Sequence, residues 1–232
     1  MLELAGVNAF YGDSHVLQDV GFTVSAGACV GLLGRNGVGK TTTLRTILGY
    51  VRATTGSIRF EGDAIERQPT HAIVRRGMSY VPEDRGIFRS LTVEEHLKVA
   101  DRVAESDERF AIDEAYQLFP RLAERRRNLG SHLSGGEQQM LAIARALVGS
   151  SRFVIMDEPT EGLAPVVIDQ ISEAIGRLRA QGTTMLLVET NFHVARRVCD
   201  RACLLDRGRV VYEGAMADLG PDHELVKSYI GV

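Results

Sequence analysis

The sequence predicts an α/β fold built on a parallel β-sheet, and three short apolar segments carry this prediction. Residues 29–33, 153–156 and 184–188 are continuous apolar runs of strand length, and segments with helical periodicity separate them. Strands that are apolar on both faces are typical of a parallel sheet covered by helices on both sides. The length of 232 residues fits one large domain, or a core with a small inserted subdomain.

Two further segments predict other kinds of structure. The first ~25 residues and residues 57–60 alternate apolar and polar side chains and contain turn residues, which predicts an antiparallel β-layer. Residues 86–130 contain no convincing strand. Thr92 and Glu95 have the spacing of a capping box that opens a helix, and residues 113–119 predict a second helix that ends at Pro120.

The expected organisation is therefore a single domain over residues 1–232. We expect the α/β core with its β-subdomain in residues 1–85 and 131–232, and a helical subdomain in residues 86–130. Two later helices with apolar stripes facing the core are predicted over residues 137–148 and 166–178.

Composition and charge exclude several classes of protein. With 44% hydrophobic and 25% charged residues, the chain is neither disordered nor fibrous. A net charge of -3 argues against a nucleic-acid partner, because such proteins usually have a basic surface. The three scattered cysteines, Cys29, Cys199 and Cys203, favour structural thiols in a reducing compartment.

The sequence also predicts where the protein is found. No apolar run approaches the ~20 residues that span a bilayer, and the first residues do not resemble a signal peptide. We therefore expect a cytoplasmic protein that reaches a membrane only through a partner. The arginine-rich segment 121–127 is interpreted as a solvated helix face, or alternatively as a contact with a partner protein or lipid headgroups.

The strongest local motif is a glycine-rich phosphate-binding loop at residues 34–42. It lies after the predicted strand 29–33 and before a helical run, so backbone N–H groups and the helix N-terminus converge on one anion. Lys40 is positioned to reach the outer phosphates, and the Thr41 hydroxyl to ligate Mg²⁺. The expected nucleotide-binding residues of the loop are Gly34, Arg35, Asn36, Gly37, Val38, Gly39, Lys40, Thr41 and Thr42.

Two acids follow the predicted strand 153–156. Asp157 and Glu158 are expected at the carboxyl end of a parallel strand, where ligands bind in such sheets. Asp157 is the candidate Mg²⁺ ligand. Glu158 is the candidate that positions or deprotonates the attacking water.

A second predicted anion site lies at residues 133–139. Ser134 is a natural N-cap, and Gly135 and Gly136 expose backbone N–H groups at the start of a helix near Glu137. The alternative is a capped helix with a glycine-rich lead-in. Two copies facing each other could each close the other's nucleotide with this segment.

Together these segments resemble the nucleotide-binding subunits of ABC transporters, over essentially the whole chain. Residues 34–42 resemble Walker A, residues 133–139 the family signature and residues 153–158 Walker B. The resemblance implies a P-loop NTPase fold, with a RecA-like core, an antiparallel β-subdomain and a helical subdomain. It also implies ATP and Mg²⁺ as cofactors, and two subunits that enclose two ATP molecules. The residues expected to act on the opposing subunit's nucleotide are Ser134, Gly135, Gly136 and Gln138.

Other positions resemble the family one at a time. Tyr11 matches the aromatic residue that stacks on adenine, and Val16 the apolar residue beside it. Glu83 stands where the family usually has a glutamine that senses Mg²⁺, so it is a candidate for both catalysis and metal binding. Thr190 stands where most members have a histidine that contacts the γ-phosphate, and Ala164 where many have aspartate.

The departure at Thr190 bears on catalysis. Threonine cannot carry a positive charge to the transition state, so its contribution is expected to be lost unless His193, three residues further on, replaces it. Hydrolysis is therefore expected to depend mainly on Glu158, together with Lys40. The expected metal ligands are Thr41, Asp157 and Glu83.

Four segments narrow the resemblance to a subgroup. They are similar to the branched-chain amino acid importer ATPases of the LivF type, although urea and short-chain amide importer ATPases share much of the pattern. This resemblance implies two multi-span permeases, a second related ATPase or a second copy of this chain, an external solute-binding protein, and a place at the cytoplasmic face of the cell membrane. The four segments are residues 81–83, 91–95, 133–147 and 161–165.

The alternatives to an importer ATPase are a catalytically weak regulatory subunit, a soluble ATPase of the same family and a P-loop kinase.

Overall fold

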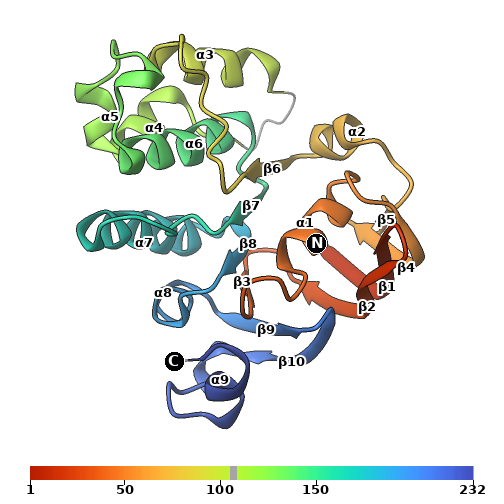
Figure 1. The fold of residues 1–232 in the computed structure, drawn as a ribbon. Coiled ribbons are helices and arrows are strands. Elements are labelled where there is room, and N and C mark those ends of the chain that lie inside the picture. The colour runs from red at the N-terminus through yellow and green to blue at the C-terminus, as the bar shows by residue number, and fades with distance from the viewer. Residues whose placement is uncertain (105–108, 232) are drawn as a thin grey trace.

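The computed structural model describes residues 1–104 and 109–231 and confirms the α/β fold (Figure 1). The three predicted apolar strands are neighbours in one sheet, in the order β3, β8, β7, and all of their residues are buried. The five strands from β9 to β6 are parallel, and β10 pairs antiparallel with β9. In spatial order the sheet contains β10 (Arg209–Ala215), β9 (Arg201–Asp206), β3 (Cys29–Leu33), β8 (Thr184–Glu189), β7 (Phe153–Asp157) and β6 (Met78–Val81).

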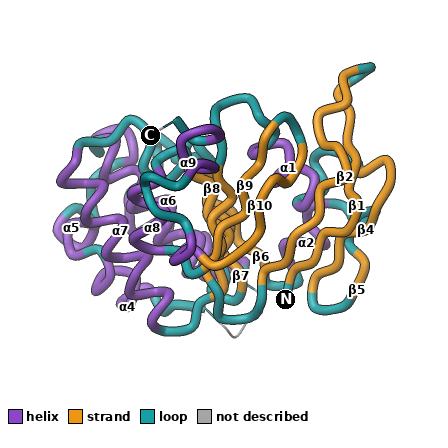
Figure 2. The backbone as a smooth tube through the Cα atoms, turned by 90° about the horizontal axis from the view of Figure 1, so that it is seen from below, coloured by secondary structure: helices purple, strands orange, loops and turns teal. Residues whose placement is uncertain are grey.

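The predicted antiparallel layer is a second, four-stranded sheet. Its apolar side faces the parallel sheet, and α1 (Lys40–Ile47) is packed in the same hydrophobic core. Figure 2 shows this sheet on one side of the parallel sheet and most of the helices on the other. Its strands in spatial order are β2 (Ser14–Val24), β1 (Leu2–Tyr11), β4 (Ala53–Phe60) and β5 (Asp63–Ala64).

Alternation along β3 divides the interior into two cores. Val30 and Leu32 belong to the core shared with the antiparallel sheet, whereas Cys29 and Leu33 belong to the core shared with the helices. This follows from the strand period of two residues.

The helices outside residues 86–130 are α1 (Lys40–Ile47), α2 (Thr70–Arg75), α6 (Gly135–Gly149), α7 (Pro165–Ala180), α8 (Phe192–Val198) and α9 (Glu224–Tyr229), with short 3₁₀ turns at Gly130–His132 and Met216–Asp218.

The described part of the predicted helical subdomain, residues 86–130, contains helices; residues 105–108 of it lie outside the described residues. These helices are α3 (Val93–Val103), α4 (Ile112–Leu118) and α5 (Pro120–Glu124). Pro120 was expected only to end a helix, but it also opens α5. Proline fits the first helical position because an N–H group there would have no acceptor within the helix, so its absence costs no hydrogen bond.

The predicted capping box at the start of α3 is confirmed. The Thr92 hydroxyl accepts a hydrogen bond from the Glu95 N–H at 3.2 Å, and the Glu95 carboxylate accepts one from the Thr92 N–H at 2.7 Å. The two bonds satisfy donors that would otherwise lack partners at the helix N-terminus.

We predict that Thr92→Ala lowers the free energy of unfolding by about 1 kcal/mol, because the cap is lost. Urea denaturation followed by circular dichroism measures the change. Thr92→Ser keeps the hydroxyl and serves as the control. An unchanged urea midpoint in Thr92→Ala would show that the cap does not stabilise the fold.

Candidate functional site

The loop between β3 and α1 has the backbone shape of an anion-binding site. Gly34 and Gly39 have φ angles of 151° and 114°, and a Cβ atom on Gly34 would lie 2.3 Å from the Leu205 carbonyl oxygen. Helix α1 begins directly after Gly39, and no side chain caps it. Its first-turn N–H groups are therefore available to a phosphate.

Lys40 is buried at the centre of this loop. Its Nζ donates to the carbonyl oxygens of Gly34 at 2.9 Å and Arg35 at 3.1 Å, and lies 3.2 Å from Glu158 Oε1. The side chains of Lys40 and Glu158 are 3% and 7% exposed, so this ion pair is buried. The ammonium group is thus already positioned between the loop and the end of β7.

Asp157 lies beside Thr41 at the base of the site. The Thr41 hydroxyl donates to Asp157 Oδ1 at 3.5 Å, and the Tyr80 hydroxyl donates to Oδ2 at 3.2 Å. Burial raises the pKa of Asp157 to about 6, and the nearby charges of Glu158 and Glu83 act in the same direction. A hydroxyl and a carboxylate in contact form a donor set that suits Mg²⁺.

Glu158 has an unusual backbone conformation and an oxygen without a partner. Its φ angle is 47°, in the left-handed region, and its N–H donates to the Val188 carbonyl oxygen at 3.0 Å. Glu158 Oε2 is buried and makes no hydrogen bond in the structure. This orphaned acceptor fits a water molecule or another donor in the cavity.

The cavity around Lys40 and Glu158 has a volume of about 250 Å³ and is polar. Glu161, which the sequence reasoning did not single out, also lines it. The neighbouring Glu158 carboxylate, together with burial, raises the pKa of Glu161 to about 7. The lining residues are Val16, Asn36, Gly37, Gly39, Lys40, Thr41, Thr42, Glu83, Glu158 and Glu161.

A larger cavity of about 700 Å³ adjoins this one, and Thr41 and Glu83 line both. Tyr11 lies in the larger cavity, whereas Val16 lies in the smaller one, so the two expected adenine contacts line adjoining cavities. A hydrogen bond with Tyr11 raises the pKa of Arg45, which lines the same cavity. The larger cavity also contains Tyr80, which was missed although it directly precedes the motif at residues 81–83.

The predicted second anion site is the N-terminus of α6. Ser134 caps the helix in a capping box with Glu137, and α6 begins at Gly135, so both glycines lie within the first turn rather than before it. Gln138 donates to the Gly130 carbonyl oxygen at 3.0 Å. Residues 134–138 line neither of the two cavities.

The structure gives part of the arginine-rich segment a role within the chain. Arg121 and Arg125 lie 3.3 and 3.5 Å from Glu137 Oε1, and these two charges help to lower the pKa of Glu137. The same carboxylate accepts from the Ser134 N–H through Oε2. Two arginines of the segment therefore contact the cap of the α6 N-terminus.

Thr190 and His193 are not brought to the cavities. Thr190 follows β8, is partly buried and lines neither cavity, and His193 is exposed on α8. The alternative that His193 replaces Thr190 thus has no support from these contacts.

Comparison with known proteins identifies the chain's relatives. A family model described as ABC transporter matches residues 17–161. The chain belongs to the ABC transporter family. Over 232 residues, the whole of both proteins, it is 41% identical to the high-affinity branched-chain amino acid transport ATP-binding protein BraG of Pseudomonas aeruginosa. It is also 36% identical to the probable branched-chain amino acid transport ATP-binding protein LivF of Archaeoglobus fulgidus, covering 100% and 99% of the two chains.

Other relatives and solved structures agree with this assignment. The lipopolysaccharide export ATP-binding protein LptB of Haemophilus influenzae is 35% identical, over 95% of this chain and 93% of that protein. A solved ATP-binding subunit of an ABC transporter is 32% identical with a TM-score of 0.79, over 94% and 91% of the two chains. A dimeric ATP-binding cassette with bound ADP and Pi has the same fold, with a TM-score of 0.82 and 22% identity over 93% and 99% of the chains. This ABC transporter protein is thus an ATP-binding subunit and an ATP hydrolase.

The raised pKa of Asp157 predicts how stability varies with pH. Because the folded pKa of about 6 exceeds the ordinary value of 3.8, the folded state binds more protons than the unfolded state between these values. The free energy of unfolding should therefore fall as the pH rises from about 4 to about 6. Removing the carboxylate by Asp157→Asn should reduce this fall, by an amount on the order of 2 kcal/mol.

Urea denaturation of the metal-free protein at pH 4, 5, 6 and 7 measures this difference. Asp13→Asn removes an exposed carboxylate of the β1–β2 turn and is the matched control. Equal pH dependence in Asp157→Asn and the parent would contradict the assignment.

Proposed function

We propose that this subunit hydrolyses ATP to power the import of branched-chain or other hydrophobic amino acids. The observation that carries the chemistry is the meeting of Lys40, Thr41, Asp157 and Glu158 at the carboxyl ends of β3 and β7. The full-length similarity to BraG and LivF supports the solute class. A urea or short-chain amide importer is the alternative within the same subgroup.

The chain's own groups bind the triphosphate in this proposal. The backbone N–H groups of residues 34–42 and the α1 N-terminus surround the β- and γ-phosphates, and Lys40 adds a positive charge. To contact the γ-phosphate, Lys40 exchanges its contact with Glu158 for one with the substrate. Tyr11 and Val16 contact the adenine from the two adjoining cavities.

Thr41 and Asp157 are the residues that would hold Mg²⁺, with Glu83 facing the same space. When bound, the metal supplies positive charge that offsets the charge developing on the γ-phosphate. The Tyr80 hydroxyl keeps Asp157 oriented and favours its ionised form, which is the form that ligates a metal.

Glu158 positions the attacking water and takes its proton. The partnerless Oε2 atom is the acceptor in this step, and Oε1 becomes available when Lys40 turns to the phosphate. The left-handed backbone at Glu158 directs the carboxylate toward the cavity. Thr190 contributes at most a hydrogen bond, and its absence from the cavity linings favours a weakly catalytic regulatory subunit as the second candidate function.

A composite site explains the second anion-binding helix. We propose that Ser134, Gly135, Gly136 and Gln138 complete the nucleotide site of an opposing subunit, either a second copy or a related ATPase. The separation of these residues from this chain's own cavities supports the proposal.

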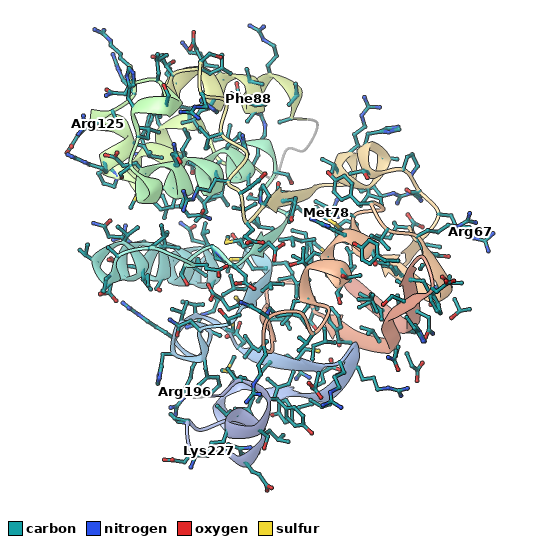
Figure 3. All side chains as sticks on the ribbon, in the orientation of Figure 1. Arg67, Met78, Phe88, Arg125, Arg196 and Lys227 are labelled. Carbon is teal, nitrogen blue, oxygen red and sulfur yellow. The ribbon has the colours of Figure 1, made fainter. Side chains whose placement is uncertain are left out.

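A membrane partner is also part of the proposal. Among the described residues, no helix has both the length and the apolar character needed to cross a bilayer. An apolar groove of about 420 Å³ lies between α2 and β6 on one side and α3 and the C-terminal part of α6 on the other, with Met78 on its β6 side and Phe88 on its helical side (Figure 3). Its large exposed apolar side chains are Val74, Phe88, Val99 and Val103.

We propose that this groove binds one of two permease subunits, which would place the protein at the cytoplasmic face of the membrane. The groove includes Gly86 and Phe88, which follow Glu83 in the chain, so a bound partner would contact the segment that reaches the nucleotide cavities. An external solute-binding protein would act through the permeases.

We predict that Glu158→Gln reduces ATP hydrolysis by at least about a hundredfold while ATP binding is retained, because the proton acceptor is removed. Phosphate release by the chain co-expressed with its membrane subunits, and fluorescence titration with an ATP analogue, measure the two properties. Hydrolysis at the parent rate would rule out the assigned role. Glu173→Gln on the exposed side of α7 is the control.

We predict that Val103→Lys weakens association with the permease subunits by about tenfold or more, because a charge enters an apolar contact. Co-purification with the permeases measures this effect, and ATP binding should be unchanged. Val211→Lys, at another exposed apolar position on β10, is the matched control. Equal recovery of the two variants would exclude the groove as the permease site.

A further inference from the structure

A buried carboxyl group lies next to the site and is not used by the chemistry described above. Glu189 is the last residue of β8 and is 1% exposed. Its Oε1 accepts a hydrogen bond from the Thr160 hydroxyl at 2.7 Å, and its Oε2 accepts one from the Asn191 N–H at 3.4 Å. The carboxyl group therefore joins two segments that are distant in sequence.

The first of these segments is the turn that contains Glu158. The Glu161 N–H donates to the Glu158 carbonyl oxygen at 3.2 Å, and Thr160 lies between them. A left-handed conformation at a residue other than glycine costs on the order of 1 kcal/mol, and it persists only where the surroundings restrain it. At Glu158 the restraints come from β8. The Val188 carbonyl oxygen accepts a hydrogen bond from the Glu158 N–H, and the Glu189 carboxylate accepts one from the hydroxyl of Thr160, two residues after Glu158.

The second segment is the chain after β8. The Asn191 N–H donates to Glu189, and the Asn191 side chain accepts from the first N–H groups of α8. Thr190 lies between these two residues. The position of the Glu158 turn and the path of the Thr190 segment thus depend on the same carboxyl group.

We propose that Glu189 is a positioning residue for ATP hydrolysis, and that its hydrogen bond to the Thr160 hydroxyl fixes the turn that directs the Glu158 carboxylate into the phosphate cavity. This inference rests on the proposed role of Glu158. Neither side chain lines either cavity, so we assign the effect of the pair on the reaction to the orientation of Glu158.

A purely structural role for the pair makes a different prediction. A hydrogen bond that only stabilises the fold lowers the free energy of unfolding, but leaves the turnover of each folded subunit unchanged. A positioning role lowers kcat and leaves the KM for ATP nearly unchanged, because Lys40 and the phosphate-binding loop are intact. Misplacement of a catalytic group by about 1 Å can reduce the rate by about a hundredfold.

The test compares Thr160→Val with Thr160→Ser in the full chain co-expressed with its membrane subunits. Valine has nearly the shape of threonine but lacks the hydroxyl, whereas serine keeps it. We expect Thr160→Val to lower kcat by about tenfold or more with KM for ATP within about twofold, and Thr160→Ser to stay within about threefold of the parent. Thr184→Val is the matched control, since it removes a buried hydroxyl that accepts from the Gly27 N–H at the other end of β8.

Variants of the partner residue provide an independent measurement. Glu189→Gln keeps an oxygen that can accept from Thr160, so it should retain more activity than Glu189→Met. In the double variant Thr160→Val with Glu189→Met, kcat should be no lower than in Glu189→Met alone, because the two side chains act as one unit. Rates are expressed per subunit that binds a fluorescent ATP analogue, which removes any contribution from unfolded protein.

Three results would overturn the proposal: a parent kcat in Thr160→Val, equal kcat in Thr160→Val and Thr184→Val, or multiplied losses in the double variant. Glu158→Gln, measured in parallel, separates this failure from that of the proposed function. If Glu158→Gln is inactive and Thr160→Val is fully active, only the positioning role is wrong. If Glu158→Gln is fully active, the role of Glu158 is wrong and the positioning role fails with it.

Discussion

The site depends on the parallel pairing of β8 with both β3 and β7. In this register Leu33 is opposite Glu189, and Val188 is opposite Asp157, so all three strands end at the same edge of the sheet. The phosphate-binding loop, the two acids and the Thr190 segment all lie at or directly after the carboxyl ends of these strands. Segments from three distant parts of the chain therefore meet without any contact between them having to be specified separately.

The chemistry of that edge is dominated by acids around one buried lysine. Burial raises the pKa of Asp157 to about 6 and that of Glu189 to about 7, and a contact with Glu158 contributes to the raised pKa of Glu161. Removing these carboxylates from water is unfavourable. Carboxyl groups with pKa values shifted in this way are common where residues are arranged for binding and catalysis rather than for stability. Lys40 contacts one member of this cluster of acids, Glu158, through an ion pair. A ligand that brings a metal ion to Asp157 would offset part of the negative charge.

Much of the fold and the site could be predicted from local sequence. The loop at residues 34–42, the acids after residue 156 and the cap at Ser134 have fixed spacings, and each depends on contacts within a few residues. Local sequence did not predict hydrogen bonds between side chains that lie on separate elements. The bond between Tyr80 and Asp157 and the bond between Thr160 and Glu189 join residues on different segments, and only the sheet order brings them together.

Surface features show the same limit. The arginine-rich segment is exposed, as expected of a solvated face, but its pattern did not predict that Arg121 and Arg125 also contact Glu137 on α6. The apolar groove collects Val74 from α2, Phe88 from a loop, and Val99 and Val103 from α3. No single helix of this set has a pattern that distinguishes it from an ordinary helix packed on a core.

The contact between α6 and α7 has a consequence for communication within an assembled pair. A Cβ atom on Gly136 would lie 2.7 Å from Val167 Cγ1, so the first turn of α6 is pressed against the first turn of α7. Helix α7 directly continues the loop that begins at Glu158. In the proposed pair, Glu158 of a subunit serves one ATP molecule and Ser134 of the same subunit serves the other. A displacement of the Glu158 loop would be transmitted through this tight contact to the far nucleotide, which gives the two hydrolysis events a short mechanical route to cooperativity.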